Sequence, residues 1–168
     1  MDNAHQNWRQ DDPRFNQAPA WPAEQFPNAE YRYFRDCGCL VCALAVMLRH
    51  GNIEKEEDER LFNPWILNER LICCGAFDTE ADLELSDISR LYPLEYLGEL
   101  PYSRSTLAHI AASNLPCLIT VPGTNATLHF TALLHLTEDD AVVFDPCCGK
   151  RKLSSYKHVY EIRPFRPE

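Results

Sequence analysis

The 168 residues include 25 acidic and 16 basic side chains, and the formal net charge is −9. A polyphosphate would be repelled unless a local basic patch attracted it, so we expect no nucleic-acid partner. Hydrophobic residues make up 45% of the chain, which is typical of a globular protein and excludes the disordered class. The length suits one domain of residues 1–168.

Neither a membrane segment nor a secretion signal is expected. Membrane-spanning helices need about 18 or more consecutive apolar residues, and no such run occurs. The segment from Met1 to Trp8 is polar. It lacks the positively charged region followed by an apolar region that a signal peptide has. We therefore expect a cytoplasmic protein whose eight cysteines are mostly reduced thiols.

Residues 1–36 predict an extended lead-in that packs on the domain. Four prolines exclude a long helix here: Pro13, Pro19, Pro22 and Pro27. The segment is also rich in Trp, Tyr and Phe, and a free linker would gain nothing from so much apolar area.

Helices are predicted next. Cys39 to His50 is apolar on nearly every face, which indicates a buried helix, and Gly51 follows it at the usual place of a left-handed cap. A second helix begins with the cap Asn63 and Pro64 and stops at Gly75. Shorter helices are expected at 83–92, before a proline, and at 105–113.

After Pro116 the pattern is that of strands. The β-rich runs are 117–121, 128–136, 141–144 and 157–163, and turn residues separate the first three. Helices followed by strands with short connections predict an α+β fold with a largely antiparallel sheet.

Cys39, His129 and Asp145 form a candidate catalytic set. Cys39 opens the buried helix, so its sulfur would lie near unpaired backbone N–H groups and the positive helix end, which favour a thiolate. His129 and Asp145 lie on two strands that can pair as a hairpin, and a base with an orienting acid would complete the set. Taken singly, each residue type is more often a core or turn residue, so the spacing alone makes only a candidate.

The chain resembles papain-like cysteine peptidases related to the bacteriocin-leader-processing peptidases, in the form common in bacterial and phage proteins. The resemblance covers nearly the whole chain in order. It is carried by Gln10-Asp11-Asp12-Pro13-Arg14-Phe15, Gly38-Cys39 with Leu44-Ala45, the helix from Asn63 to Gly75, His129-Phe130, Asp145-Pro146, and the segment from Gly149 to Tyr156.

The resemblance implies a papain-like α+β fold with a buried nucleophile helix, and amide hydrolysis without a cofactor. Cys39 would be the nucleophile, His129 the base, Asp145 the orienting residue and Gln10 the donor that stabilises an oxyanion. The substrate would be a peptide or protein, an isopeptide or a peptidoglycan crosslink. The chain departs from the family at Cys42-Ala43 and Cys147-Cys148, and the lead-in between Gln10 and Cys39 is longer.

Four alternatives stay open at this point. Cys37 is a rival nucleophile, because Asp36-Cys37-Gly38 matches the leader-processing branch, although the spacing to Leu44 favours Cys39. The protein could be an inactive binding or inhibitory protein on the same scaffold, or a thiol-dependent acyl transferase. A zinc or iron–sulfur site could use Cys37, Cys39 and Cys42 with one of the cysteine pairs, Cys73-Cys74 or Cys147-Cys148, but the spacings fit no familiar set.

Overall fold

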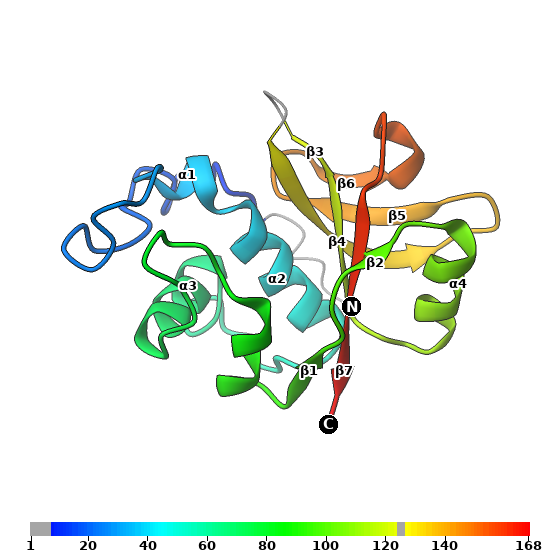
Figure 1. The fold of residues 1–168 in the computed structure, drawn as a ribbon, viewed down its shortest axis with the longest axis horizontal. Helices are drawn as coiled ribbons and strands as arrows, with labels where there is room; N and C mark the ends of the chain where they lie inside the picture. The colour runs from blue at the N-terminus through cyan, green and yellow to red at the C-terminus, as the bar shows by residue number, and fades with distance from the viewer. Residues whose placement is uncertain (1–7, 124–126) are drawn as a thin grey trace.

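The computed structural model describes residues 8–123 and 127–168 (Figure 1). In chain order its elements are α1 (Phe34–Cys37), α2 (Cys39–His50), α3 (Pro64–Cys73), the 3₁₀ helix η2 (Leu85–Arg90), β1 (Leu94–Tyr96), β2 (Leu100–Pro101), α4 (Arg104–Ala112), β3 (Cys117–Pro122), β4 (Leu128–Leu136), β5 (Ala141–Asp145), β6 (Gly149–Lys152), the 3₁₀ helix η4 (Leu153–Ser155) and β7 (Glu161–Pro167).

The strands form one open sheet in the order β1-β7-β3-β4-β5-β6, and β2 also pairs with β7. Every strand pairing in the described part of the chain is antiparallel. The protein is therefore a mixed helix and sheet structure with an antiparallel open sheet, which is compatible with the α+β class expected from the sequence.

Helix α2 packs on one face of this sheet (Figure 1). Its residues from Val41 to Leu48 are all buried, which explains why the sequence is apolar around the whole helix. They pack in one cluster with Leu118, Ala132 and Phe144, which come from three neighbouring strands. The helix that begins with Cys39 is thus fixed against the centre of the sheet.

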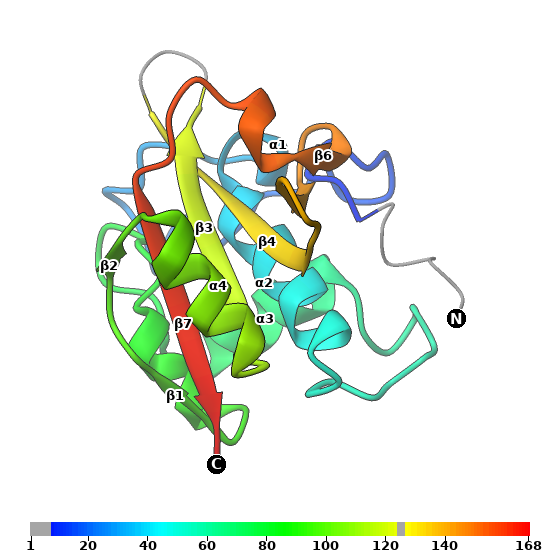
Figure 2. The ribbon, with the colours of Figure 1, turned by 90° about the vertical axis from the view of Figure 1, so that its right-hand side faces the viewer.

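Helix α4 covers the opposite face, and Figure 2 shows it in front of β7 and β3. Leu107 and Ile110 of α4 pack in a second cluster with Ile119 of β3 and Val143 of β5. Strand β3 is therefore buried on both faces, which accounts for its nearly continuous apolar sequence.

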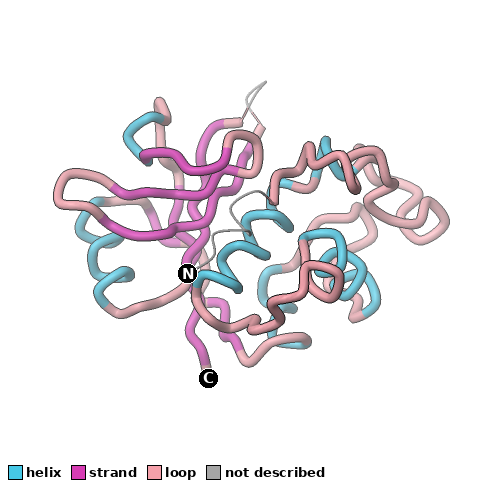
Figure 3. Tube along the Cα trace, turned by 180° about the vertical axis from the view of Figure 1, so that it is seen from behind, coloured by secondary structure: helices cyan, strands magenta, loops and turns pink. Residues whose placement is uncertain are grey.

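The lead-in packs against the helical side of the molecule, where Figure 3 shows mostly loops. Trp8 and Phe15 are 2% and 5% exposed. Their rings meet Phe62 and Phe34 edge-on, with centroids 5.6 and 5.2 Å apart. These contacts tie residues 8–33 to the domain, while residues 1–7 of the expected lead-in lie outside the described part.

The predicted helices at 39–50 and from Pro64 are present, but several other details differ. The segment expected as a helix at 83–92 forms only the 3₁₀ helix η2. The last strand begins at Glu161 rather than residue 157, and it contains two prolines. After α2, the left-handed residue is Asn52 (φ 57) rather than Gly51, whose φ is −75. Strands β1, β2 and β6 were not predicted.

Within the described ranges, no helix combines the length and apolar character needed to cross a membrane.

Candidate active site

Cys39 is the first residue of α2, and it follows Gly38 at the N-cap. Gly38 offers no side-chain cap, so the N–H groups of the first turn face the site without a side-chain acceptor. The position needs a glycine because an added Cβ would lie 2.6 Å from both a ring carbon and the carbonyl oxygen of Phe34. The Cys39 side chain is half-buried and lines a cavity.

The β4–β5 pairing brings His129 to Asp145. Ala132 of β4 lies opposite Phe144 of β5. Because the two strands are antiparallel, continuing this register by one residue places Thr131 opposite Asp145. His129 is two residues from Thr131 and therefore on the same face of β4. The ring Nε2 of His129 lies 2.9 Å from Oδ1 of Asp145, and both residues are buried. The hairpin expected from the sequence thus joins the two side chains.

Four donors among the described residues hold the Asp145 carboxylate. Oδ1 accepts from His129 Nε2 and, at 2.7 Å, from the backbone N–H of Cys147. Oδ2 accepts from the Tyr156 hydroxyl at 2.5 Å and from Arg151 Nη1 at 3.4 Å. Burial alone would raise the pKa of Asp145, but the hydrogen bonds from His129, Tyr156 and Cys147 hold that pKa well below its usual range. The carboxylate is therefore charged at neutral pH.

The charge on Asp145 and the contact with Cys39 set the protonation of His129. Burial lowers the pKa of His129, but the hydrogen bonds from Asp145 and Cys39 and the charges of both groups raise it to about 9. Since Nε2 is engaged by Asp145, Nδ1 is the ring nitrogen left for the Cys39 sulfur. The imidazole is thus a positive group between a buried carboxylate and a cysteine.

Cys37 lies in a different environment from Cys39. Its thiol donates to the carbonyl oxygen of Tyr33, with sulfur and oxygen 3.3 Å apart. Burial, together with the nearby Cys39 and Asp36, raises the pKa of Cys37 to about 12. Cys37 is therefore a protonated thiol at neutral pH, and the choice of Cys39 over this rival nucleophile stays a prediction.

The cysteines do not form the metal site considered from the sequence. All eight are free thiols. In the described ranges, the one group with metal-binding potential is His129, Asp145 and Cys147, whose ligand atoms lie within 4.8 Å of one another. It contains neither Cys37 nor Cys42. Burial and the Asp145 charge raise the pKa of Cys147 to about 11, so this neighbour is also a neutral thiol.

Gln10 lies between the Asp145 segment and the start of the helices. Its backbone N–H donates to the Pro146 carbonyl at 3.0 Å, and its side-chain amide donates to the Arg35 carbonyl at 2.5 Å. One N–H of the amide is therefore used by α1, and the side chain is not among the residues that line the cavity at Cys39. The oxyanion role of Gln10 stays a prediction.

The cavity at Cys39 has a volume of about 530 Å³. It is bounded by the lead-in, the junction of α1 and α2, the loop that follows α3, and the start of β4. Leu128 and Phe130, on either side of His129 in β4, belong to its wall. A ligand in this cavity would therefore lie in a space that Cys39 helps to line.

Sequence reasoning did not assign a role to Tyr156 or Arg151. Both contact Asp145, and the Arg151 guanidinium lies 4.6 Å from the centre of the Tyr156 ring. The segment from Gly149 to Tyr156 was part of the family resemblance, and that was the available signal. Comparison with protein-family models and with curated proteins found no match.

Proposed function

We propose that this protein is a papain-like thiol hydrolase that cleaves amide bonds through Cys39, His129 and Asp145. The observation that carries the proposal is the position of His129, whose Nε2 lies 2.9 Å from Oδ1 of the buried Asp145 carboxylate. The contacts of the ring with Asp145 and with Cys39 both raise the pKa of His129. A nucleophile, a base and an orienting acid in hydrogen-bonded order are what acyl transfer requires.

The reaction has two steps. In the first, the Cys39 thiolate attacks the carbonyl carbon, and the negative charge moves to the carbonyl oxygen. The His129 imidazolium gives its proton to the leaving nitrogen as the C–N bond breaks, which leaves a thioester on Cys39. In the second, neutral His129 takes a proton from water, the resulting hydroxide attacks the thioester, and the acid product leaves as the Cys39 thiolate and the imidazolium re-form.

Two surrounding features support this chemistry. The first-turn N–H groups of α2 lie beside the sulfur and can stabilise the negative oxygen, an effect worth about 3 kcal/mol per well-placed donor. Asp145 is fixed by Tyr156 and the Cys147 backbone, so the tautomer and orientation of His129 are fixed in turn. No step in this scheme draws on a cofactor.

The direct test is to trap the acyl-enzyme. The protein is mixed with a peptide methyl ester, acidified within seconds, and analysed by intact-protein and peptide mass spectrometry. We expect the acyl mass on Cys39 in the native chain and none in Cys39→Ala. With His129→Ala, formation should slow by about 10²- to 10⁴-fold. A Cys37→Ser variant should form the adduct at the native rate, and an adduct that disappears with this variant would contradict the assignment.

A further inference from the structure

The cavity at Cys39 carries a strong excess of negative charge. Four carboxylates are among its lining residues, Glu30, Asp36, Glu80 and Asp82, and all four are exposed. Among the described lining residues there is no lysine, arginine or histidine. An open cavity lined by one sign of charge attracts the opposite charge.

Most of this charge is not neutralised by neighbouring groups. Asp36 forms an ion pair with Arg35 at 3.5 Å. Within the ranges that the structure describes, Glu30, Glu80 and Asp82 make no ion pair, because none of the salt bridges of these ranges includes them. Three of the four carboxylates that line the cavity thus make no ion pair with a described residue.

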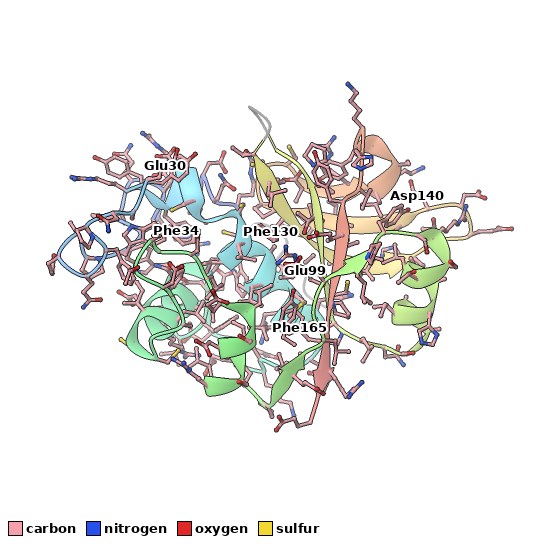
Figure 4. All side chains as sticks on the ribbon, viewed as in Figure 1. Glu30, Phe34, Glu99, Phe130, Asp140 and Phe165 are labelled. Atoms are coloured by element: carbon pink, nitrogen blue, oxygen red, sulfur yellow. The ribbon has the colours of Figure 1, made fainter. Side chains whose placement is uncertain are left out.

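The inner wall of the cavity is aromatic. Trp21 and Phe77 lie with ring centroids 5.8 Å apart, and the buried Phe34 is also among the lining residues. Figure 4 labels Glu30 and Phe34, at the α1 end of the cavity, and Phe130, on the β4 side. Aromatic rings accept the methylene groups of a long side chain, and their faces also attract a cation.

A buried acceptor without a donor provides an independent indication of a ligand. Asn68 is 1% exposed and lines the same cavity. Its Nδ2 donates to the Ala20 carbonyl, which fixes the amide, and its Oδ1 accepts from no group of the described chain. A buried oxygen in this state requires an N–H or O–H donor. Guanidinium and ammonium groups carry only donors.

We propose that this cavity recognises a cationic side chain of the substrate, so that the preferred substrates are peptides with arginine or lysine next to the bond that is cleaved. This inference rests on the proposed thiol hydrolase function and names its substrate class. The aliphatic part of the side chain lies on the aromatic wall, and its charge meets the carboxylates at the rim. The net charge of −9 of the whole chain also attracts a basic peptide to the protein.

The test compares pairs of tripeptide chloromethyl ketones that differ only in arginine against citrulline, its neutral isostere, at one position. Modification of Cys39 is followed by mass spectrometry. At one position we expect the arginine probe to react about 3- to 10-fold faster than its citrulline partner, as three exposed ion pairs would give. This preference should shrink when the salt concentration is raised from 0.05 to about 0.5 M.

Two double variants distinguish the effect of the cavity carboxylates from the effect of the overall negative charge of the protein. Among the residues that the structure describes, neither Glu80 nor Asp82 makes an ion pair, so Glu80→Gln with Asp82→Asn removes two charges and breaks no ion pair. We expect this variant to lose about 3-fold of the arginine preference. The control is Glu138→Gln with Asp139→Asn, which removes two charges from the β4–β5 turn, away from the cavity. It should keep the native preference.

Failure of this inference differs from failure of the proposed function. Equal rates for every arginine and citrulline pair, with Cys39 still modified, would overturn the cationic cavity and leave the thiol chemistry intact. If the untargeted reagent chloroacetamide shows no preference for Cys39, the hydrolase function fails. The cavity is then tested by fluorescence anisotropy with Cys39→Ala and labelled arginine and citrulline peptides, where equal affinity overturns the inference and tighter arginine binding supports it.

Discussion

Replacing Asp145 with asparagine should lower the pKa of His129 and remove most of the activity. The substitution keeps the size of the side chain but removes the buried charge that His129 Nε2 contacts at 2.9 Å. The pKa of His129 is raised to about 9 from an ordinary 6.5, and Asp145 is the first of the groups that raise it. At about 1.36 kcal/mol per pKa unit, the whole difference corresponds to about 3 kcal/mol. Without the carboxylate, the pKa should fall to about 7 or below.

The pKa is measured by NMR, from the pH dependence of the imidazole Cε1–Hε1 signals. The chain has six histidines, and the His129 signal is the one that is missing from His129→Gln. Amide hydrolysis by Asp145→Asn should be slower by about 10²- to 10⁴-fold, because the imidazolium is neither stabilised nor oriented.

Asp140→Asn is the matched control. Asp140 also carries one negative charge, but it contacts Ser154 and backbone groups near the β4–β5 turn rather than His129. The pKa of His129 should then stay within about 0.3 of the native value, since exposed charges at a distance are screened. A pKa of His129 that is unchanged in Asp145→Asn would refute the reasoning, because the buried carboxylate could not then be what keeps the ring charged.

The remaining predictions concern the nucleophile, the folding of the helices and the pH dependence. Cys39→Ser should abolish hydrolysis. Cys37→Ser should retain at least about half of the native kcat/KM in the same assay, since Cys37 is a neutral thiol whose hydrogen bond goes to the Tyr33 carbonyl. Asn63→Ala removes the side-chain cap of α3 and should lower the free energy of unfolding, measured by urea titration, by about 1 kcal/mol. Leu48→Ala changes a fully buried position of α2 and should lower it by about 2–5 kcal/mol. Because the pKa of His129 is raised in the folded protein, protonated His129 adds to the free energy of unfolding. This contribution is complete below pH 6.5 and is lost as the pH rises through about 9. Urea titrations between pH 6.5 and 9.5 should therefore show a decline in stability that is absent from His129→Gln, and parallel curves for the two proteins would contradict it.

Long apolar segments of the fold could be predicted because each one is specified by its own residues. The helix from Cys39 to His50 has the predicted ends, since an unbroken apolar run between two glycines leaves few other structures. Strand β3 was recognisable for the same reason, because a strand buried on both faces needs apolar residues throughout. The cap Asn63, whose side chain accepts from the Ile66 N–H, fixed the start of α3.

The missed elements depend on partners that are distant in sequence. Strand β6 reads Gly-Lys-Arg-Lys and has no strand signal of its own; it forms because it pairs with β5. The last strand was predicted at 157–163, but β7 continues through Pro164 to Pro167, and proline normally argues against a strand between two others. Its pairing with β1 and β3 overrides this local preference.

The contacts of the candidate site were only partly visible in the sequence. His129 and Asp145 could be paired because they lie on consecutive strands of one hairpin, where register decides the contact. The Tyr156 contact with Asp145 comes from the segment after β6 and the 3₁₀ helix η4, whose path no periodicity predicts. The carboxylates of the cavity come from separate loops, so their convergence on one space required the structure.

The reactivity of Cys39 with a small alkylating agent tests the thiol and imidazole pair most directly. The protein is treated briefly with iodoacetamide at pH 6, where an ordinary thiol is almost fully protonated, and the modification of all eight cysteines is quantified by peptide mass spectrometry. Cys39 should react at least about ten times faster than Cys37 or Cys147, and this advantage should vanish in His129→Ala. Uniform slow modification of the cysteines in the native protein would mean that the imidazolium does not activate this sulfur.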